Sequence, residues 1–264
     1  MRLLRLATLV AGTLACGGCF QMTTVMKLQG DGSGTIEHRM LFTTQALQQL
    51  RQFSALGGGR GQTLDPTSEQ QARDMVSALG PGVTYVSSTP VTTAIGQGRD
   101  AVYAFTDVSQ LRLAAQPPAP GGAAIRAQGL STDGETLTFS LTREPNGNAV
   151  LHINVPQPAI LDAMSSNAAT PQQIEMVRKM LAGARVSLAV EPAGTLVRTS
   201  SPFVDGPRVT LLEIDLDQVL QNDVVVERLQ AAKTPDDLRA AVKDVPGLKV
   251  SLEREITIEF TPGR

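Results

Sequence analysis

The last extended run of the chain, residues 248–260, alternates between apolar and polar side chains with a single exception. The apolar side chains occupy the even positions, which are Leu248, Val250, Leu252, Ile256, Ile258 and Phe260. A period of two is typical of a β-strand with one buried face and one solvated face. At about 3.3 Å per residue, the run spans roughly 43 Å. We therefore expect one long C-terminal strand, antiparallel to its neighbours, that could run along a whole sheet and unite the two halves of the chain.

Glycine-containing turns between other alternating runs predict three β-hairpins, because glycine readily adopts the positive φ that such turns need. The three hairpins join residues 22–28 to 35–42, residues 136–142 to 151–155, and residues 185–191 to the run that starts at Thr195. Further extended segments are expected over residues 83–91, 99–106 and 208–216. The chain is therefore rich in strands that follow one another closely.

Apolar residues at helical spacing predict a few short amphipathic helices between these strands. One follows Thr67, with a stripe made of Ala72, Met75, Val76 and Leu79. Others are expected over residues 47–53, over the stripe of Ile174, Val177 and Leu181, and after the cap at Thr234. Residues 216–232 have no decisive period. The predicted fold class is α+β, with antiparallel β-sheets and hairpins packed by a few amphipathic helices.

Proline and glycine crowd the middle of the chain, above all in residues 114–124. Such composition interrupts periodicity and is typical of linkers. We expect an N-terminal ββααββ region over residues 19–113, a linker or loop over 114–130, and a C-terminal α+β region over 131–264.

The first 18 residues are typical of an export signal. Arg2 and Arg5 precede an apolar run of about ten residues, which is too short to cross the ~30 Å core of a bilayer as a helix. Both cysteines of the chain, Cys16 and Cys19, lie at the end of this run. Their placement resembles that of a bacterial lipoprotein signal, in which a cysteine after a small residue is acylated and becomes the first residue. Cys19 is the predicted lipidation site and Cys16 the alternative. A secreted protein with two incidental cysteines, or with a disulfide between them, is the alternative, and the pattern of the charged and apolar regions favours the lipoprotein over it.

Composition argues against several classes of partner. The formal net charge is −2, and it becomes −4 once Arg2 and Arg5 are removed with the signal, so the basic surface that nucleic acid requires is not expected. Aromatic residues make up 3% of the chain and tryptophan is absent, which leaves few rings for stacking on sugars or bases. After Cys19, no stretch approaches 18 consecutive apolar residues.

The candidate reactive residues form no recognisable catalytic or metal motif. His38 shares the parity of its apolar neighbours and is expected to be buried, whereas His152 should point outward. Two histidines without further cysteine supply no zinc signature, and Ser33 lies in a predicted hairpin turn. The glycine run 57–61 lacks the Lys-Ser/Thr ending of a phosphate loop. We expect no enzyme, no cofactor and no metal.

An acidic segment and one arginine are further candidate binding sites. Glu213, Asp215 and Asp217, followed by Asn222 and Asp223, could supply oxygen ligands to Ca²⁺, but the EF-hand order is missing and a solvated acidic face is expected. The single exception to the C-terminal alternation is Arg254, on the apolar side. It should extend to solvent, pair with a carboxylate or discourage edge pairing, with contact to an anionic ligand as the alternative.

Residues 19–35, Cys-Phe-Gln-Met-Thr-Thr-Val-Met-Lys-Leu-Gln-Gly-Asp-Gly-Ser-Gly-Thr, resemble the start of bacterial envelope lipoproteins of the LppM-like kind. In these proteins an acylated cysteine leads into a strand, an Asp-Gly-Ser-Gly turn and a second strand. The resemblance implies an envelope lipoprotein without assigned catalysis and supplies no site residues. Such proteins commonly carry a C-terminal membrane helix, which this sequence lacks.

The sequence thus predicts a lipid-anchored protein of the bacterial cell envelope that faces the periplasm, on the outer membrane if the cell has two membranes. Acyl chains would hold it on the membrane, and its body would bind an envelope protein or an apolar ligand without catalysis. The alternatives are a lipid-carrier or membrane-contact module, and a hydrolase that uses carboxylates alone.

Overall fold

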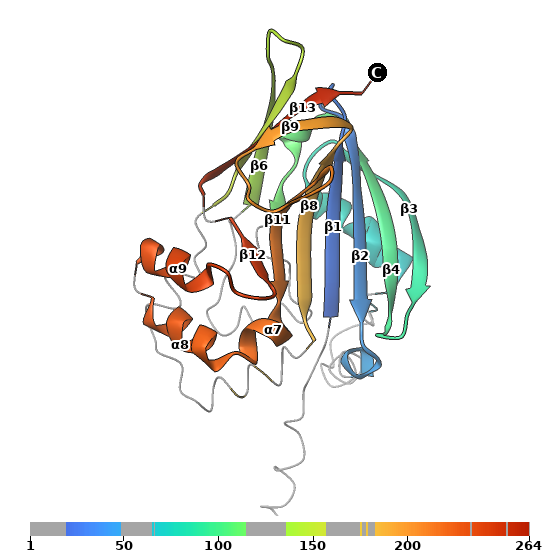
Figure 1. Ribbon diagram of the computed structural model, residues 1–264. Coiled ribbons are helices and arrows are strands. Elements are labelled where there is room, and N and C mark those ends of the chain that lie inside the picture. The colour runs from blue at the N-terminus through green and yellow to red at the C-terminus, as the bar shows by residue number, and fades with distance from the viewer. Residues whose placement is uncertain are drawn as a thin grey trace, which may run out of the picture.

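Two β-sheets with short helices packed against them make up the architecture (Figure 1). The computed structural model describes residues 20–48, 65, 67–114, 136–156, 175, 178, 183–232, 234–251 and 253–263. Several predictions concern residues outside these ranges: the signal 1–18 with Cys16, Cys19 itself, the glycine run 57–61, residues 115–130 of the linker, Leu252, and the helical stripe of Ile174, Val177 and Leu181.

Among the described residues, eight strands form the larger sheet, in the order β10-β11-β8-β1-β2-β4-β3, with β12 also paired to β11. Their bounds are β1 Phe20–Leu28, β2 Gly34–Phe42, β3 Val83–Thr92, β4 Gln97–Phe105, β8 Arg185–Pro192, β10 Val204–Asp205, β11 Arg208–Asp215 and β12 Leu248–Val250. The smaller sheet has the order β5-β6-β7-β13-β9. Its strands are β5 Leu113–Ala114, β6 Thr136–Arg143, β7 Ala149–Asn154, β9 Gly194–Thr199 and β13 Glu255–Pro262.

Short helices pack beside the two sheets. They are α2 Glu69–Asp74, α3 Val76–Leu79, the 3₁₀ helix η1 Val108–Gln110, α7 Leu216–Leu220, α8 Asp223–Ala231 and α9 Pro235–Val242. The expected cap at Thr234 is present, where Thr234 and Asp237 exchange reciprocal hydrogen bonds, and Ser68 caps α2, its Oγ accepting from the Gln71 N–H at 3.1 Å. Residues 216–232, which had no decisive period, form α7 and α8. The described residues are rich in strands and have few helices, which is consistent with the predicted α+β class.

The larger sheet is mixed, which corrects the expectation of purely antiparallel pairing. The first hairpin, β1–β2, is antiparallel as expected, but β1 pairs on its other side with β8 in parallel, from Gln21 opposite Arg185 to Leu28 opposite Pro192. Alternation reports which face is buried and carries no information on the direction of a distant neighbour. The pair joins strands from the two predicted regions of the chain, whose division at residues 114–130 stays a prediction.

The predicted third hairpin is wrong. Strands β8 and β9 are separated by Ala193 alone, yet β8 pairs with β1 and β11 while β9 pairs with β13 in the other sheet. The chain therefore crosses between sheets here. Gly194 has a φ of +153°, and a Cβ on it would lie 2.0 Å from the Thr261 carbonyl oxygen, so the close approach at this crossing requires glycine.

The prediction of a single long C-terminal strand is also wrong, because the run forms two separate strands. Its first part is β12, on the edge of β11 in the larger sheet, and its second part is β13, inside the smaller sheet between β7 and β9. The run does connect the two sheets, through residues 251–254. Arg254, the one exception to the alternation, is exposed within this crossing rather than on the apolar face of a strand. Its carbonyl accepts from the Val155 N–H at 2.9 Å.

One main hydrophobic core is shared by both sheets. It includes Ile36 and Tyr103 from the larger sheet and Ile153 and Phe260 from the smaller one, all fully buried. The Tyr103 hydroxyl donates to the Ala72 carbonyl at 2.8 Å and so fastens α2 to the larger sheet. Two smaller apolar clusters lie elsewhere: one contains Phe42, Ala46 and Leu47, and the other lies under α7 to α9, around Val219, Val225 and Val245.

Candidate functional site

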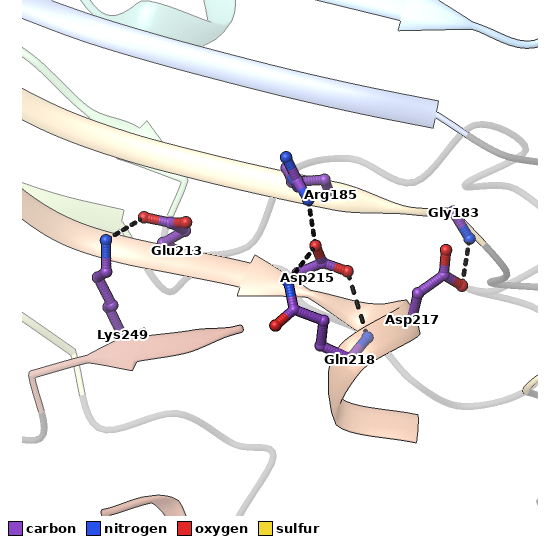
Figure 2. A network of polar contacts seen from close by, with 7 residues as sticks. All are labelled: Gly183, Arg185, Glu213, Asp215, Asp217, Gln218 and Lys249. Atoms are coloured by element: carbon purple, nitrogen blue, oxygen red, sulfur yellow. Dashed lines mark hydrogen bonds and ion pairs between the residues drawn. The ribbon is translucent and has the colours of Figure 1, made fainter. Parts of the chain in front are cut away.

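The acidic segment that follows the middle of β11 is the richest polar cluster that the sequence singled out (Figure 2). Glu213 and Asp215 lie two residues apart on β11 and therefore on one face of it. Asp217 was expected to lie with Glu213 and Asp215 on the extended segment, but it lies in the first turn of α7. Asn222 is the N-cap of α8 and Asp223 its first residue. The structure thus spreads the five residues over a strand end and two helix starts.

Asp215 has the most contacts of this group. It lies directly opposite Arg185 of β8 and forms an ion pair with it. Its side chain also caps α7, accepting from the Gln218 backbone N–H at 3.3 Å and from Gln218 Nε2 at 2.9 Å. Burial raises the pKa of Asp215, but the hydrogen bonds from Arg185 and Gln218 outweigh it and hold that pKa below its ordinary value.

The other carboxylates are held in the same way. Glu213 accepts from Lys249 Nζ of β12 at 2.8 Å, across a directly paired position. Asp217 accepts from the Gly183 backbone N–H at 2.6 Å. Asp223 pairs with Arg178, and the Asn222 side chain accepts from the Val225 N–H. Each of these side-chain oxygens is thus engaged, in an ion pair, in a helix cap or, for Asp217, with the Gly183 backbone N–H.

The chemistry of this cluster is therefore structural. No group of three or more His, Cys, Asp or Glu side chains arranged to hold a metal ion occurs within the part of the chain that the structure covers. Glu213 and Asp215 are neighbouring carboxylates, but each is neutralised by its own cation, which gives the hypothesis of a carboxylate-dependent hydrolase no support here. The network fastens α7 and β12 to the end of β8 and β11.

His38 lies on the covered side of β2, as predicted, and is 6% exposed. Its Nδ1 is hydrogen-bonded to Thr24 Oγ1 at 2.9 Å, and Thr24 is its direct partner on β1. Its buried Nε2 has no hydrogen-bond partner among the described residues. Burial lowers the pKa of His38 to about 4, so the ring is neutral at pH 7. Ile36 on one side of it belongs to the main core, and Met40 on the other packs on the Phe42 cluster.

His152 and Ser33 take no part in this arrangement. His152 lies in the smaller sheet, and its Nδ1 donates to Glu255 Oε1 at 2.6 Å. The distance between its Nε2 and Thr142 Oγ1 is 3.4 Å. Ser33 donates twice to Asp31 Oδ1 in the β1–β2 turn, which confirms its role in turn geometry. The structure therefore does not bring the two histidines together.

Sequence reasoning missed two buried carboxylates: Asp215, at 6% exposed, does not belong to the solvated acidic face that was expected, and Glu259 is also buried. Glu259 occupies an odd, polar position of the C-terminal alternation, yet it is 6% exposed. It accepts from Asn148 Nδ2 at 2.7 Å and from Arg198 Nε at 2.5 Å. These two hydrogen bonds lower the pKa of its carboxyl group. Asn148 lies just before β7 and Arg198 lies on β9, so no local pattern signals that they cover Glu259.

Comparison with known proteins leaves the family open. No family model matches the chain, and no curated protein matches its sequence. Among solved structures, the NMR structure of the folded domain of the LppM protein of Mycobacterium tuberculosis is similar to it, with 12% sequence identity and a TM-score of 0.33. The match covers 76% of this chain and 85% of that one. LppM gives its name to the kind of protein that residues 19–35 resemble, but similarity at this level does not show a shared family.

The described helices include none whose length and apolar character would allow it to span a membrane.

Proposed function

We propose that this chain is a lipid-anchored protein of the bacterial cell envelope, held on the membrane by acyl chains at Cys19 and facing the periplasm. Its α+β body is a non-enzymatic module that binds an envelope protein partner or an apolar ligand. In a cell with two membranes, the absence of aspartate after Cys19 favours the outer membrane.

The observation that carries the proposal is the position of the first strand. β1 begins at Phe20, directly after Cys19, and it lies between β8 and β2 inside the larger sheet. Processing before Cys19 would therefore leave a folded body whose central strand starts at its second residue. Processing before Cys16 would leave three more residues ahead of that strand. The first arrangement places the acyl chains at the end of the fold without a spacer.

The non-enzymatic part of the proposal is supported by the state of the candidate reactive groups. The carboxylates of the β11 segment are engaged in ion pairs, a helix cap and a hydrogen bond from the Gly183 N–H, and Ser33 is engaged in a turn. Groups that already hold the fold together are poorly suited to gain or lose protons in a reaction cycle.

The test is incorporation of radiolabelled palmitate into the full chain expressed in a bacterial host. We expect label in the wild type and in Cys16→Ala, and none in Cys19→Ala. Retention of label by Cys19→Ala with its loss in Cys16→Ala would move the anchor to Cys16. A wild-type protein with an unmodified Cys19 thiol and an intact Met1 by mass spectrometry would refute the lipid anchor.

A lipid-carrier module is the second candidate function, and His38 is the observation that favours it. Its buried Nε2 has no partner among the described residues, and since buried polar groups are normally hydrogen-bonded, a polar group of a bound ligand could pair with it. The test follows the ¹⁵N resonances of the His38 ring while dodecanoic acid or dodecane is added. A shift of Nε2 with the acid alone supports the carrier, and no shift with either compound argues against it.

A further inference from the structure

One end of the larger sheet is defined by the start of β1. Phe20 opens β1, and the strand register places it beside Phe42, the last residue of β2, which in turn pairs with Gln97, the first residue of β4. Figure 1 shows these strand ends together at the lower end of the larger sheet, with β9 at the opposite end of the molecule. The turn between β3 and β4, residues 93–96, lies at this end, as do the helical residues 44–48 that follow β2 (Figure 1).

This turn is tightly closed by hydrogen bonds. The Thr93 N–H donates to the Gly96 carbonyl at 2.8 Å, and Thr93 Oγ1 accepts from the N–H groups of Ile95 and Gly96 at 3.2 and 3.3 Å. A Cβ on Gly96 would lie 2.0 Å from the Phe42 carbonyl oxygen, so the turn also lies tightly against the end of β2. Its conformation is therefore held from two sides.

Ile95 lies within this closed turn and is 48% exposed. None of the seven residues from Thr92 to Gly98 carries a charged side chain. The nearest charges along β4 are engaged elsewhere: Arg99 donates to the Thr67 carbonyl and to Ser88 Oγ, and Asp100 pairs with Arg39 at 2.6 Å. The turn is thus a hydrogen-bonded, uncharged segment that exposes an apolar side chain on a body whose net charge is negative.

We infer that this turn contacts the surface of the membrane and that the Ile95 side chain enters the boundary between head groups and acyl chains. The inference rests on the proposed anchor at Cys19. The Cα of Cys19 is about 3.8 Å from that of Phe20, and Gln97 lies two strand spacings from Phe20, about 10 Å. The acyl chains therefore hold the turn at the bilayer at high effective concentration. An uncharged turn can enter the interfacial region without desolvating an ion.

The test places a fluorophore in the turn of the lipidated full-length protein. With the signal removed before an acylated Cys19, Ile95→Cys carries the single free thiol, which is labelled with bimane after reconstitution into phosphatidylcholine vesicles that contain a nitroxide head-group lipid. The control is Val197→Cys on β9, whose wild-type residue is 50% exposed at the other end of the molecule. We expect quenching at position 95 at least about threefold stronger than at position 197.

A second pair of variants tests the side chain itself. In a protein labelled at Ala94→Cys, Ile95→Asp should lower the quenching about twofold or more, since a carboxylate resists entry into the bilayer, whereas Val197→Asp should leave it unchanged.

The outcomes separate this inference from the proposed function. Equal quenching at positions 95 and 197 in a vesicle-bound, palmitate-labelled protein would overturn the membrane-facing turn and leave the anchor intact. Failure of the wild type to incorporate palmitate would refute the anchor, and the inference with it.

Discussion

Arg185 and Asp215 lie directly opposite each other on β8 and β11 and form an ion pair. The arginine side chain is 50% exposed, whereas the aspartate side chain is only 9% exposed. Asp215 also caps α7, so a single carboxylate fixes both the pairing of two strands and the start of the helical segment that follows.

Asp215→Ala should lower the free energy of unfolding by about 1–2 kcal/mol, because it removes a helix cap and leaves Arg185 without its partner. Asp215→Asn should cost less, since an asparagine side chain can still accept from the Gln218 N–H. Urea unfolding followed by circular dichroism measures both. The control is Lys249→Ala, which breaks the exposed pair with Glu213 and should cost less than about 1 kcal/mol. Equal losses in all three variants would contradict the role of Asp215.

The pH dependence of Asp215 has a definite sign. Its pKa is lowered in the folded protein, so its contribution to stability is present above the pKa of the unfolded chain and is lost as the pH falls through the folded pKa. Asp215→Asn should therefore show a weaker loss of stability than the wild type on acidification below about pH 4. Parallel acid-unfolding curves for the two proteins would disprove this.

The lowered pKa of His38 leads us to expect a second effect of pH on the stability of the fold, at higher pH than that of Asp215. Its pKa is about 4 in the fold against 6.5 in a free side chain, so the unfolded chain binds the proton first. Stability should fall as the pH is lowered from about 6.5 towards 4, by roughly 3 kcal/mol for this one group. His38→Leu should remove that slope, whereas His152→Leu in the smaller sheet should keep it. Urea midpoints between pH 7 and pH 4 measure the difference, and an unchanged slope in His38→Leu would refute it.

The Tyr103 hydroxyl is expected to matter more than that of Tyr85. Tyr103→Phe leaves the Ala72 carbonyl of α2 without its buried donor at 2.8 Å and should cost about 1–2 kcal/mol. Burial also raises the pKa of Tyr103 to about 12. Tyr85→Phe removes a hydroxyl that bonds to the partly buried Ser88 and should cost less. Thermal unfolding of the two variants provides the comparison, and a larger loss for Tyr85→Phe would contradict it.

Gly98 should tolerate no side chain. A Cβ there would lie 1.8 Å from the Met40 carbonyl oxygen, within the β2–β4 ladder, so Gly98→Ala must displace one of two backbone strands. We expect a loss of more than about 3 kcal/mol, in the range of severe core disruption. Gly147→Ala is the control, because its Cβ would meet nothing within 4 Å and only its positive φ opposes the change, at about 1 kcal/mol. Similar unfolding midpoints for both variants would refute this.

Local structure followed from local sequence. The hairpins β1–β2 and β6–β7, the helices that begin at Glu69 and Pro235, the turn role of Ser33 and the buried face of His38 were all predictable. In each, the decisive interactions lie within one turn or one pair of neighbouring strands, where residue spacing determines geometry.

Tertiary structure alone decided the rest. The parallel pairing of β1 with β8, the crossing at Ala193 and the division of the C-terminal run between two sheets depend on partners far away in the chain. The same holds for Glu259, which Asn148 and Arg198 bury from two other elements. An alternating pattern indicates that a segment is extended and which of its faces is buried. Which strand pairs with it, and in which direction, depends on the packing of the whole core.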